Sequence, residues 1–142
     1  MCLTIATPPV TNYAYKVYAL ASKPARGYTY GVKSTYKGNV YNIKEGEQVI
    51  KSDRKSKTLT AIERREGKVH HGIHVYTDLD GAMIDFSSNS PQNRILAIVR
   101  LIVDPKDLVA TGEFANRGSA VYTKVTFNRV LIRNHGGNVR FN

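Results

Sequence analysis

The stretch from Ile95 to Val103 constrains the fold of this 142-residue chain more than any other part of it. Apolar residues occupy both alternating sets of positions and only Arg100 interrupts them, which is typical of a strand buried on both faces. The run ends at Asp104-Pro105-Lys106-Asp107, where proline removes a ladder donor and the acidic residues favour a turn. A strand covered on both faces needs another layer on each side, so we expect it at the centre of the molecule.

Shorter runs that alternate apolar and polar residues predict a sheet around this strand. They cover Tyr13–Leu20, Tyr28–Val32, Ser34–Tyr36, Val40–Ile43, Gly72–Tyr76, Leu108–Thr111 and Ala120–Phe127. The apolar residues move from odd to even positions after Phe127, so a bulge or turn is expected near Asn128-Arg129. A further short strand near Thr58–Ile62 and a polar connection from Gly112 to Gly118 complete the expected elements.

One short helix is expected after Tyr76, with Thr77 as its N-cap. Its apolar stripe consists of Leu79, Ala82, Met83 and Phe86. The sequence therefore predicts an α+β fold: a single domain over residues 13–142, mainly a mixed or antiparallel β-sheet with one short helix packed on it. Residues 1–12 are expected to form a flexible arm, because Pro8-Pro9 interrupts regular structure. Such an arm frays unless a partner or neighbouring subunit holds it, which leaves a homo-oligomer open.

Positive charge is the strongest signal in the composition, with 21 Lys and Arg against 11 Asp and Glu. Residues 1–70 carry 13 of these cations and 5 of the acids, so most of the excess lies in the first half. A net charge of +10 favours encounter with polyanions or acidic protein surfaces. Cys2 is the only cysteine, which excludes an internal disulfide, and no apolar run reaches the ~18 residues of a membrane span. We expect a cytoplasmic protein with no membrane partner.

A basic segment at about residues 44–70 and the tyrosines before it are the candidate binding site. We expect this segment to be an exposed, mobile loop. Aromatic rings stack on unpaired bases while Lys and Arg follow phosphates, although tyrosines on strands also serve as packing residues and charge runs as solvated surface. The predicted binding residues are Lys51, Arg54, Lys55, Lys57, Arg64, Arg65, Lys68, Tyr28 and Tyr30.

The order of pieces around the central strand resembles a bacteriophage family. Gly72-Ile73-His74-Val75, a helix containing Ala82, and then Val103–Ala110 are similar to the C-terminal region of rIIB-type phage proteins and their small relatives, over about residues 70–132. The chain departs from the family at Gly112–Gly118, where it lacks the usual cysteine pattern. The resemblance implies a phage or prophage accessory protein and supplies no catalytic residues. We therefore expect a protein that acts by binding a host component rather than by catalysis. That component is either an acidic defence or nucleic-acid-handling protein or nucleic acid itself.

Two further chemistries remain open. His70 and His74 share a face of a strand and are weak candidates for zinc ligands, although a site would need more ligands from elsewhere, such as Cys2 or His135. Otherwise they are exposed or hydrogen-bonded histidines.

The second is enzymatic, because the strand–helix–strand order is similar to small mono-ADP-ribosyltransferases, which use a nicotinamide dinucleotide (NAD). The resemblance implies a late catalytic glutamate, for which Glu113 is the only choice, and a tyrosine such as Tyr76, Tyr28 or Tyr30 stacked on the cofactor. The family's early-strand His or Arg is missing from Tyr13–Leu20, although Lys16 is present. The structural alternative is that Glu113 is a solvated loop residue.

Overall fold

The computed structural model describes residues 3–6, 12–20, 26–34, 41–44, 48–69, 71–88, 95–114, 117–135 and 138–141. The strands are β1 (Leu3–Ala6), β2 (Tyr13–Leu20), β3 (Tyr30–Ser34), β4 (Tyr41–Ile43), β5 (Gln48–Lys51), β6 (Lys68–Val69), β7 (Ile73–Tyr76), β8 (Ile95–Ile102), β9 (Leu108–Phe114), β10 (Arg117–Tyr122), β11 (Lys124–His135) and β12 (Asn138–Phe141). The helices are α1 (Ala61–Glu66), α2 (Leu79–Ser88) and the 3-10 turn η1 (Pro105–Asp107). The predicted α+β class, mainly antiparallel sheet with a short helix packed on it, is confirmed.

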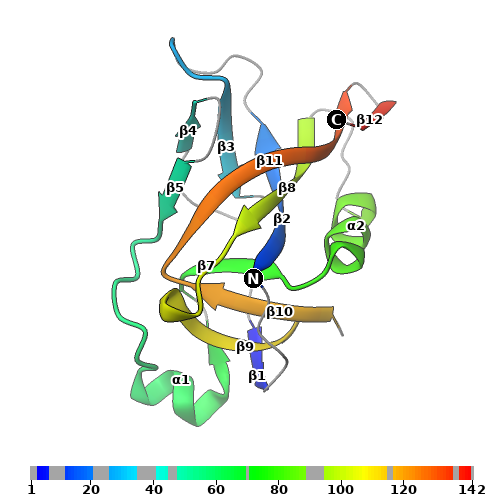
Figure 1. Ribbon diagram of the computed structural model, residues 1–142. Coiled ribbons are helices and arrows are strands. Elements are labelled where there is room, and N and C mark those ends of the chain that lie inside the picture. The colour runs from blue at the N-terminus through cyan, green and yellow to red at the C-terminus, as the bar shows by residue number, and fades with distance from the viewer. Residues whose placement is uncertain are drawn as a thin grey trace.

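One antiparallel sheet runs in the order β12-β11-β8-β2-β7-β10-β9-β1-β6, with β3 and β4 attached to β2, and β5 to β11. Figure 1 shows β3, β4 and β5 on one side of β8 and α2 on the other. The largest core cluster takes residues from eight strands, among them Tyr18, Val99 and Phe127, so the sheet curls around it. A second cluster, with Val17, Leu96 and Ile98, lies between the sheet and α2.

Strand β8 is the central strand that the apolar run predicts. It pairs with β2 on one edge and with β11 on the other. Its residues from Leu96 to Val99, and Leu101, are fully buried. Odd positions face the inside of the curl and even positions face α2, but only as far as Ile98. Beyond it, Arg100 and Ile102 are half-buried, so the even face is covered over only part of its length.

The N-terminal residues differ from the expected free arm. Leu3–Ala6 forms β1, which pairs with β9 on one edge and with β6 on the other. Proline restricts the backbone at its own position and next to it, so the diproline of the sequence does not prevent strand pairing at residues 3–6. Residues 7–11, which contain the diproline, lie outside the described residues.

The expected continuous strand Ala120–Phe127 is two strands that meet at Thr123. Strand β10 pairs with β7 and β9, whereas β11 pairs with β5 and β8. The Thr123 amide donates to the Asp107 carbonyl (2.9 Å) and its carbonyl accepts from Ser52 (2.8 Å), so the corner is held from both sides. The corner also changes which residues face inward. The predicted irregularity after Phe127 is confirmed, because the register with β8 shifts between Phe127 and Arg129.

Two other local expectations need correction. The helix α2 begins at Leu79, and the Asp78 carboxylate, not Thr77, caps it by accepting from the Gly81 amide (2.8 Å). The expected polar connection at 112–118 is mostly strand, because β9 continues to Phe114 and β10 begins at Arg117. In both cases the sequence is compatible with more than one local structure, and the cap or the strand pairing decides between them.

Candidate nucleic-acid interface

Among the described elements, helix α2 covers only part of its face of the sheet, and the part beyond it is the candidate site. Strand registers place its residues in three rows. One row contains Val49, Thr126, Ile102 and Tyr13, the next Arg129, Arg100 and Tyr15, and the last Lys51 and Lys124. We call this surface of β5, β11, β8 and β2 the outer sheet face. Tyr13 is 46% exposed and Val49 49% exposed, large values for residues of a packed sheet.

Every charged side chain in these rows is a cation. Lys51 lies directly opposite Lys124, and Arg129 directly opposite Arg100. Directly opposed like charges destabilise a sheet, since side chains at such positions are close neighbours. A bound anion removes this repulsion. Leaving out the extra residue of the bulge, the two pairs lie four residues apart along β11, or roughly 13 Å, and the row of Val49, Thr126, Ile102 and Tyr13 lies between them.

Arg100 and Tyr13 form a preorganised pair at one side of this surface. The guanidinium carbon of Arg100 lies 4.9 Å from the centre of the Tyr13 ring. The Arg100 Nε donates to the Asn128 side-chain oxygen (2.8 Å). The described residues give its two Nη atoms no hydrogen-bond partner, so they can donate to a ligand while the aromatic contact and Asn128 fix the side chain.

The predicted basic segment is more ordered than a mobile loop. It contains β5, α1 and β6, and the strand expected near Thr58–Ile62 is wrong because α1 begins at Ala61. Thr60 and Glu63 form a capping box, in which each side chain accepts from the other residue's backbone amide. Of the predicted binding residues, only Lys51 lies on the outer sheet face. Lys55, Lys57, Arg64, Arg65 and Lys68 are exposed on the 52–60 loop, α1 and β6.

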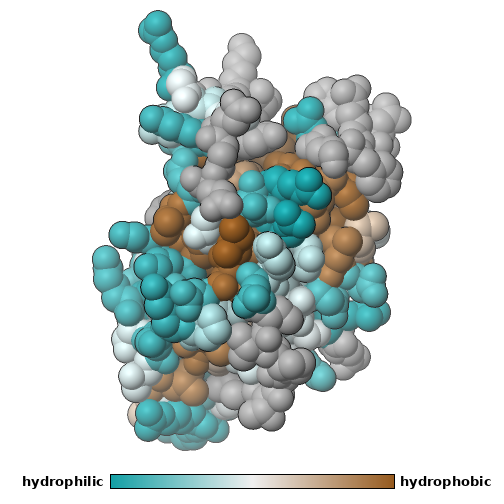
Figure 2. All heavy atoms as spheres, viewed as in Figure 1, coloured by the Kyte–Doolittle hydropathy of each residue, from teal (hydrophilic) through white to brown (hydrophobic). Residues whose placement is uncertain are grey.

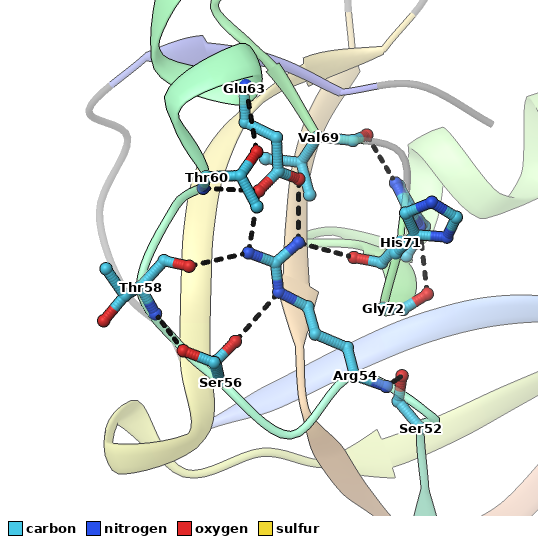
Figure 3. Close-up of polar contacts among 10 residues, drawn as sticks. Ser52, Arg54, Ser56, Thr58, Thr60, Glu63, Val69, His71 and Gly72 are labelled. Carbon is cyan, nitrogen blue, oxygen red and sulfur yellow. Dashed lines mark hydrogen bonds and ion pairs between the residues drawn. The ribbon is translucent and has the colours of Figure 1, made fainter.

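Arg54 is the exception among these cations, because its guanidinium pairs with a carboxylate of the protein itself (Figure 3). Its guanidinium donates to both carboxylate oxygens of Glu63 (2.7 and 2.8 Å). It also donates to the carbonyls of Ser56 (2.9 Å), Thr58 (3.0 Å) and His71 (3.3 Å). The side chains of Arg54 and Glu63 are only 9% and 6% exposed. The hydrogen bond from Arg54 is the main reason that the pKa of Glu63 falls to about 2.

The predicted tyrosines are not on the outer sheet face. Tyr28 is 36% exposed in the turn before β3, and the Lys44 ammonium lies 5.5 Å from its ring centre. Tyr30 is the first residue of β3, and its side chain lies outside the described residues. Tyr28 therefore lies beside Lys44, at the start of the basic segment, and away from the outer sheet face.

The histidines have different environments. His74 is buried, and its ring nitrogens face the carbonyls of Gly72 (Nδ1, 3.2 Å) and Val69 (Nε2, 3.0 Å). Burial lowers the pKa of His74, although both carbonyls act in the opposite direction. His70, and with it the proposed pair of ligands, lies outside the described residues. Within the described ranges, no group of three or more His, Cys, Asp or Glu side chains could hold a metal ion.

The structure does not bring the two candidate catalytic residues together. Tyr76 shares a lateral row with Ser119 and Gly112, so Glu113 lies on the opposite face of the sheet. Tyr76 is buried against α2, where its hydroxyl donates to Asp85 (3.1 Å), and Glu113 is exposed.

Lys16, the cation of the early strand, also has an internal partner. Its ammonium donates to the His74 carbonyl (2.8 Å) at the point where β2 leaves β7 and begins to pair with β3. Desolvation lowers its pKa to about 8. The amine thus replaces a missing strand partner for β7.

Sequence reasoning missed the outer sheet face as a unit. Its signal was Arg100, the one charged residue in the central apolar run, together with the positions of Lys124 and Arg129 on a strand with an apolar opposite face. Their grouping depends on strand register, which a single sequence does not reveal.

Comparisons with protein-family models, curated proteins and solved structures gave no match to this chain. None of the helices in the described ranges has the length and apolar character needed to cross a bilayer. The geometry of the outer sheet face is therefore the basis for a functional proposal.

Proposed function

We propose that this protein binds single-stranded nucleic acid through the outer sheet face. The observation that carries the proposal is the grouping of four cations with an exposed tyrosine, stacked against Arg100, on one face of the sheet beyond α2. Cations attract phosphates of any sequence, and an exposed aromatic ring stacks on an unpaired base. A duplex keeps its bases stacked on each other, so the ring favours single strands.

The alternative partner is a protein with an acidic surface. Such a partner would use Lys51, Lys124, Arg100 and Arg129 in the same way, but it would gain little from the flat face of Tyr13. If the chain comes from a phage, as the rIIB-type resemblance implies, host or phage single strands are the expected ligands. A pull-down from infected cells with and without nuclease separates the two classes of partner.

The decisive experiment measures binding of labelled single-stranded oligonucleotides, and of a duplex, by fluorescence anisotropy over a range of salt. A K124E/R129E variant should lose at least tenfold in affinity. The slope of log affinity against log salt should fall by about 1.4, because each lost phosphate contact removes about 0.7 for single strands. The matched control is R26E/K44E, which makes the same charge change at exposed residues near β3 and β4.

Tyr13 distinguishes base stacking from simple charge attraction. The Y13A variant should lose about 1–3 kcal/mol of single-strand affinity, whereas Y13F should keep it and duplex binding should not change. Equal losses in the R26E/K44E control and the face variant, or no loss in either face variant, would overturn the proposal. Competition by poly-glutamate as effective as competition by the oligonucleotide would favour the acidic protein.

A further inference from the structure

A second set of cations continues from the outer sheet face into residues 52–69, which we call the basic arm. Lys51 ends β5 on the face, and Lys55 follows four residues later, so their Cα atoms lie within about 14 Å of each other. The exposed cations of the arm are Lys55, Lys57, Arg64, Arg65 and Lys68. Figure 2 shows hydrophilic side chains gathered over this loop and α1, along the left and lower edges of the molecule.

The loop of the arm is wrapped around Arg54. The carbonyls of Ser56 and Thr58 accept from the Arg54 guanidinium, and the intervening side chains of Lys55 and Lys57 are exposed. Figure 3 shows the guanidinium at the centre of these contacts, with Glu63 on one side and the loop carbonyls on the other. The Ser56 and Thr58 carbonyls therefore face Arg54, and these contacts hold the backbone that carries the two lysines.

The rest of the arm is fixed at both ends. The capping box of Thr60 and Glu63 starts α1, and the Gly67 amide, in a left-handed conformation, donates to the Glu63 carbonyl to end it. Arg54 reaches the His71 carbonyl, and the buried His74 ring faces the Val69 and Gly72 carbonyls. A fixed backbone loses less conformational entropy when its side chains bind a ligand.

The composition of the arm indicates what it recognises. Residues 52–69 contain no aromatic residue, so they offer no ring on which a base could stack. Two exposed carboxylates, Asp53 and Glu66, accompany five exposed cations, and Glu63 is neutralised by Arg54. The arm therefore suits a sugar-phosphate backbone without selecting its bases.

We propose that the basic arm is a second phosphate-binding surface, contiguous with the outer sheet face, and that Arg54 and Glu63 are its positioning residues. The inference rests on the proposed function, because it assigns to the arm the part of a longer single strand that extends beyond the sheet. A short oligonucleotide fills the sheet face alone, whereas a long one binds both surfaces.

The test compares oligo-dT of about four nucleotides with oligo-dT of about 16, the two ends of the range for one small binding domain. The K55E/K57E variant should bind the long oligonucleotide at least tenfold more weakly, with a salt slope lower by about 1.4, and should bind the short one as before. The R54M/E63M variant keeps the net charge but removes the buried pair. It should lose about threefold to tenfold in affinity for the long oligonucleotide only, and trypsin should cleave it faster at Lys55 and Lys57.

Each outcome decides one proposal. Unchanged binding of the long oligonucleotide by K55E/K57E would overturn the arm as a phosphate-binding surface. Faster cleavage of R54M/E63M with unchanged affinity would show that the buried pair is structural and does not position the arm. If wild-type protein binds neither length, the proposed function itself fails. Loss of both lengths in K124E/R129E, with no effect in K55E/K57E, would retain the sheet face and reject the arm.

Discussion

Replacing Glu63 by Gln measures how strongly the buried ion pair stabilises the protein. The Glu63 carboxylate accepts from both Nη atoms of Arg54 and from the Thr60 amide (3.0 Å). Folding lowers its pKa from 4.5 to about 2, which corresponds to about 3 kcal/mol of stability at neutral pH. The E63Q variant should lose about that amount, because it leaves the Arg54 charge buried without its partner.

The loss of stability in E63Q depends on pH in a defined way. Since the folded-state pKa lies below the unfolded one, the stabilisation is complete above about 4.5 and is lost as the pH falls towards 2. The difference between wild type and E63Q should therefore narrow from about 3 kcal/mol at pH 7 to less than half of that at pH 3.

Urea unfolding followed by far-UV circular dichroism gives both free energies of unfolding. The matched control is E113Q, which removes an exposed carboxylate from β9 and should change stability by less than about 0.5 kcal/mol. A loss below about 1 kcal/mol at pH 7, or a loss of the same size at both pH values, would refute the assignment of this energy to the ion pair.

Two further predictions concern Gly72, directly before β7, and His74 within it. Because burial lowers the pKa of His74, wild-type stability should decrease as the pH falls from about 6.5 towards 4.5, above the range in which Glu63 contributes. The H74N variant should lose this decrease, whereas H71N, at an exposed position, should keep it. Thermal unfolding at several pH values measures both. A Cβ at Gly72 would lie 2.4 Å from Val121 Cγ1 and the residue has φ +124°, so G72A should lose about 2–4 kcal/mol, against about 1 kcal/mol for G67A, where φ is +66° and the space is open. Equal losses in the two glycine variants would contradict the role given to close packing at Gly72.

Much of the fold could be predicted because several elements have a strong periodic pattern. The strands β2 and β8 and most of α2 follow directly from the spacing of their apolar residues. The corner at Thr123 could not be predicted in this way, because the alternation continues from β10 into β11 without a glycine or proline. The corner depends instead on tertiary hydrogen bonds of Thr123, which donates to the Asp107 carbonyl and accepts from the Ser52 amide.

The basic segment shows a different limit of sequence reasoning. The spacing of Thr60 and Glu63 is that of a capping box, but the density of cations around it favoured a loop. Whether a given arginine binds an external anion or an internal carboxylate depends on which residues the fold places beside it. Arg54 pairs with Glu63, which lies nine positions further along the chain. Arg100 instead contacts Tyr13 and Asn128, which lie on two other strands.

Backbone amide shifts in a titration with a short oligo-dT show directly whether the outer sheet face binds single strands. We expect the largest shifts in β2, β8, β11 and β5, at Tyr13, Arg100, Lys124, Arg129 and Lys51, with small shifts in β3 and β4. Shifts concentrated on β3 and β4, or spread evenly over the basic surface of the molecule, would contradict the account.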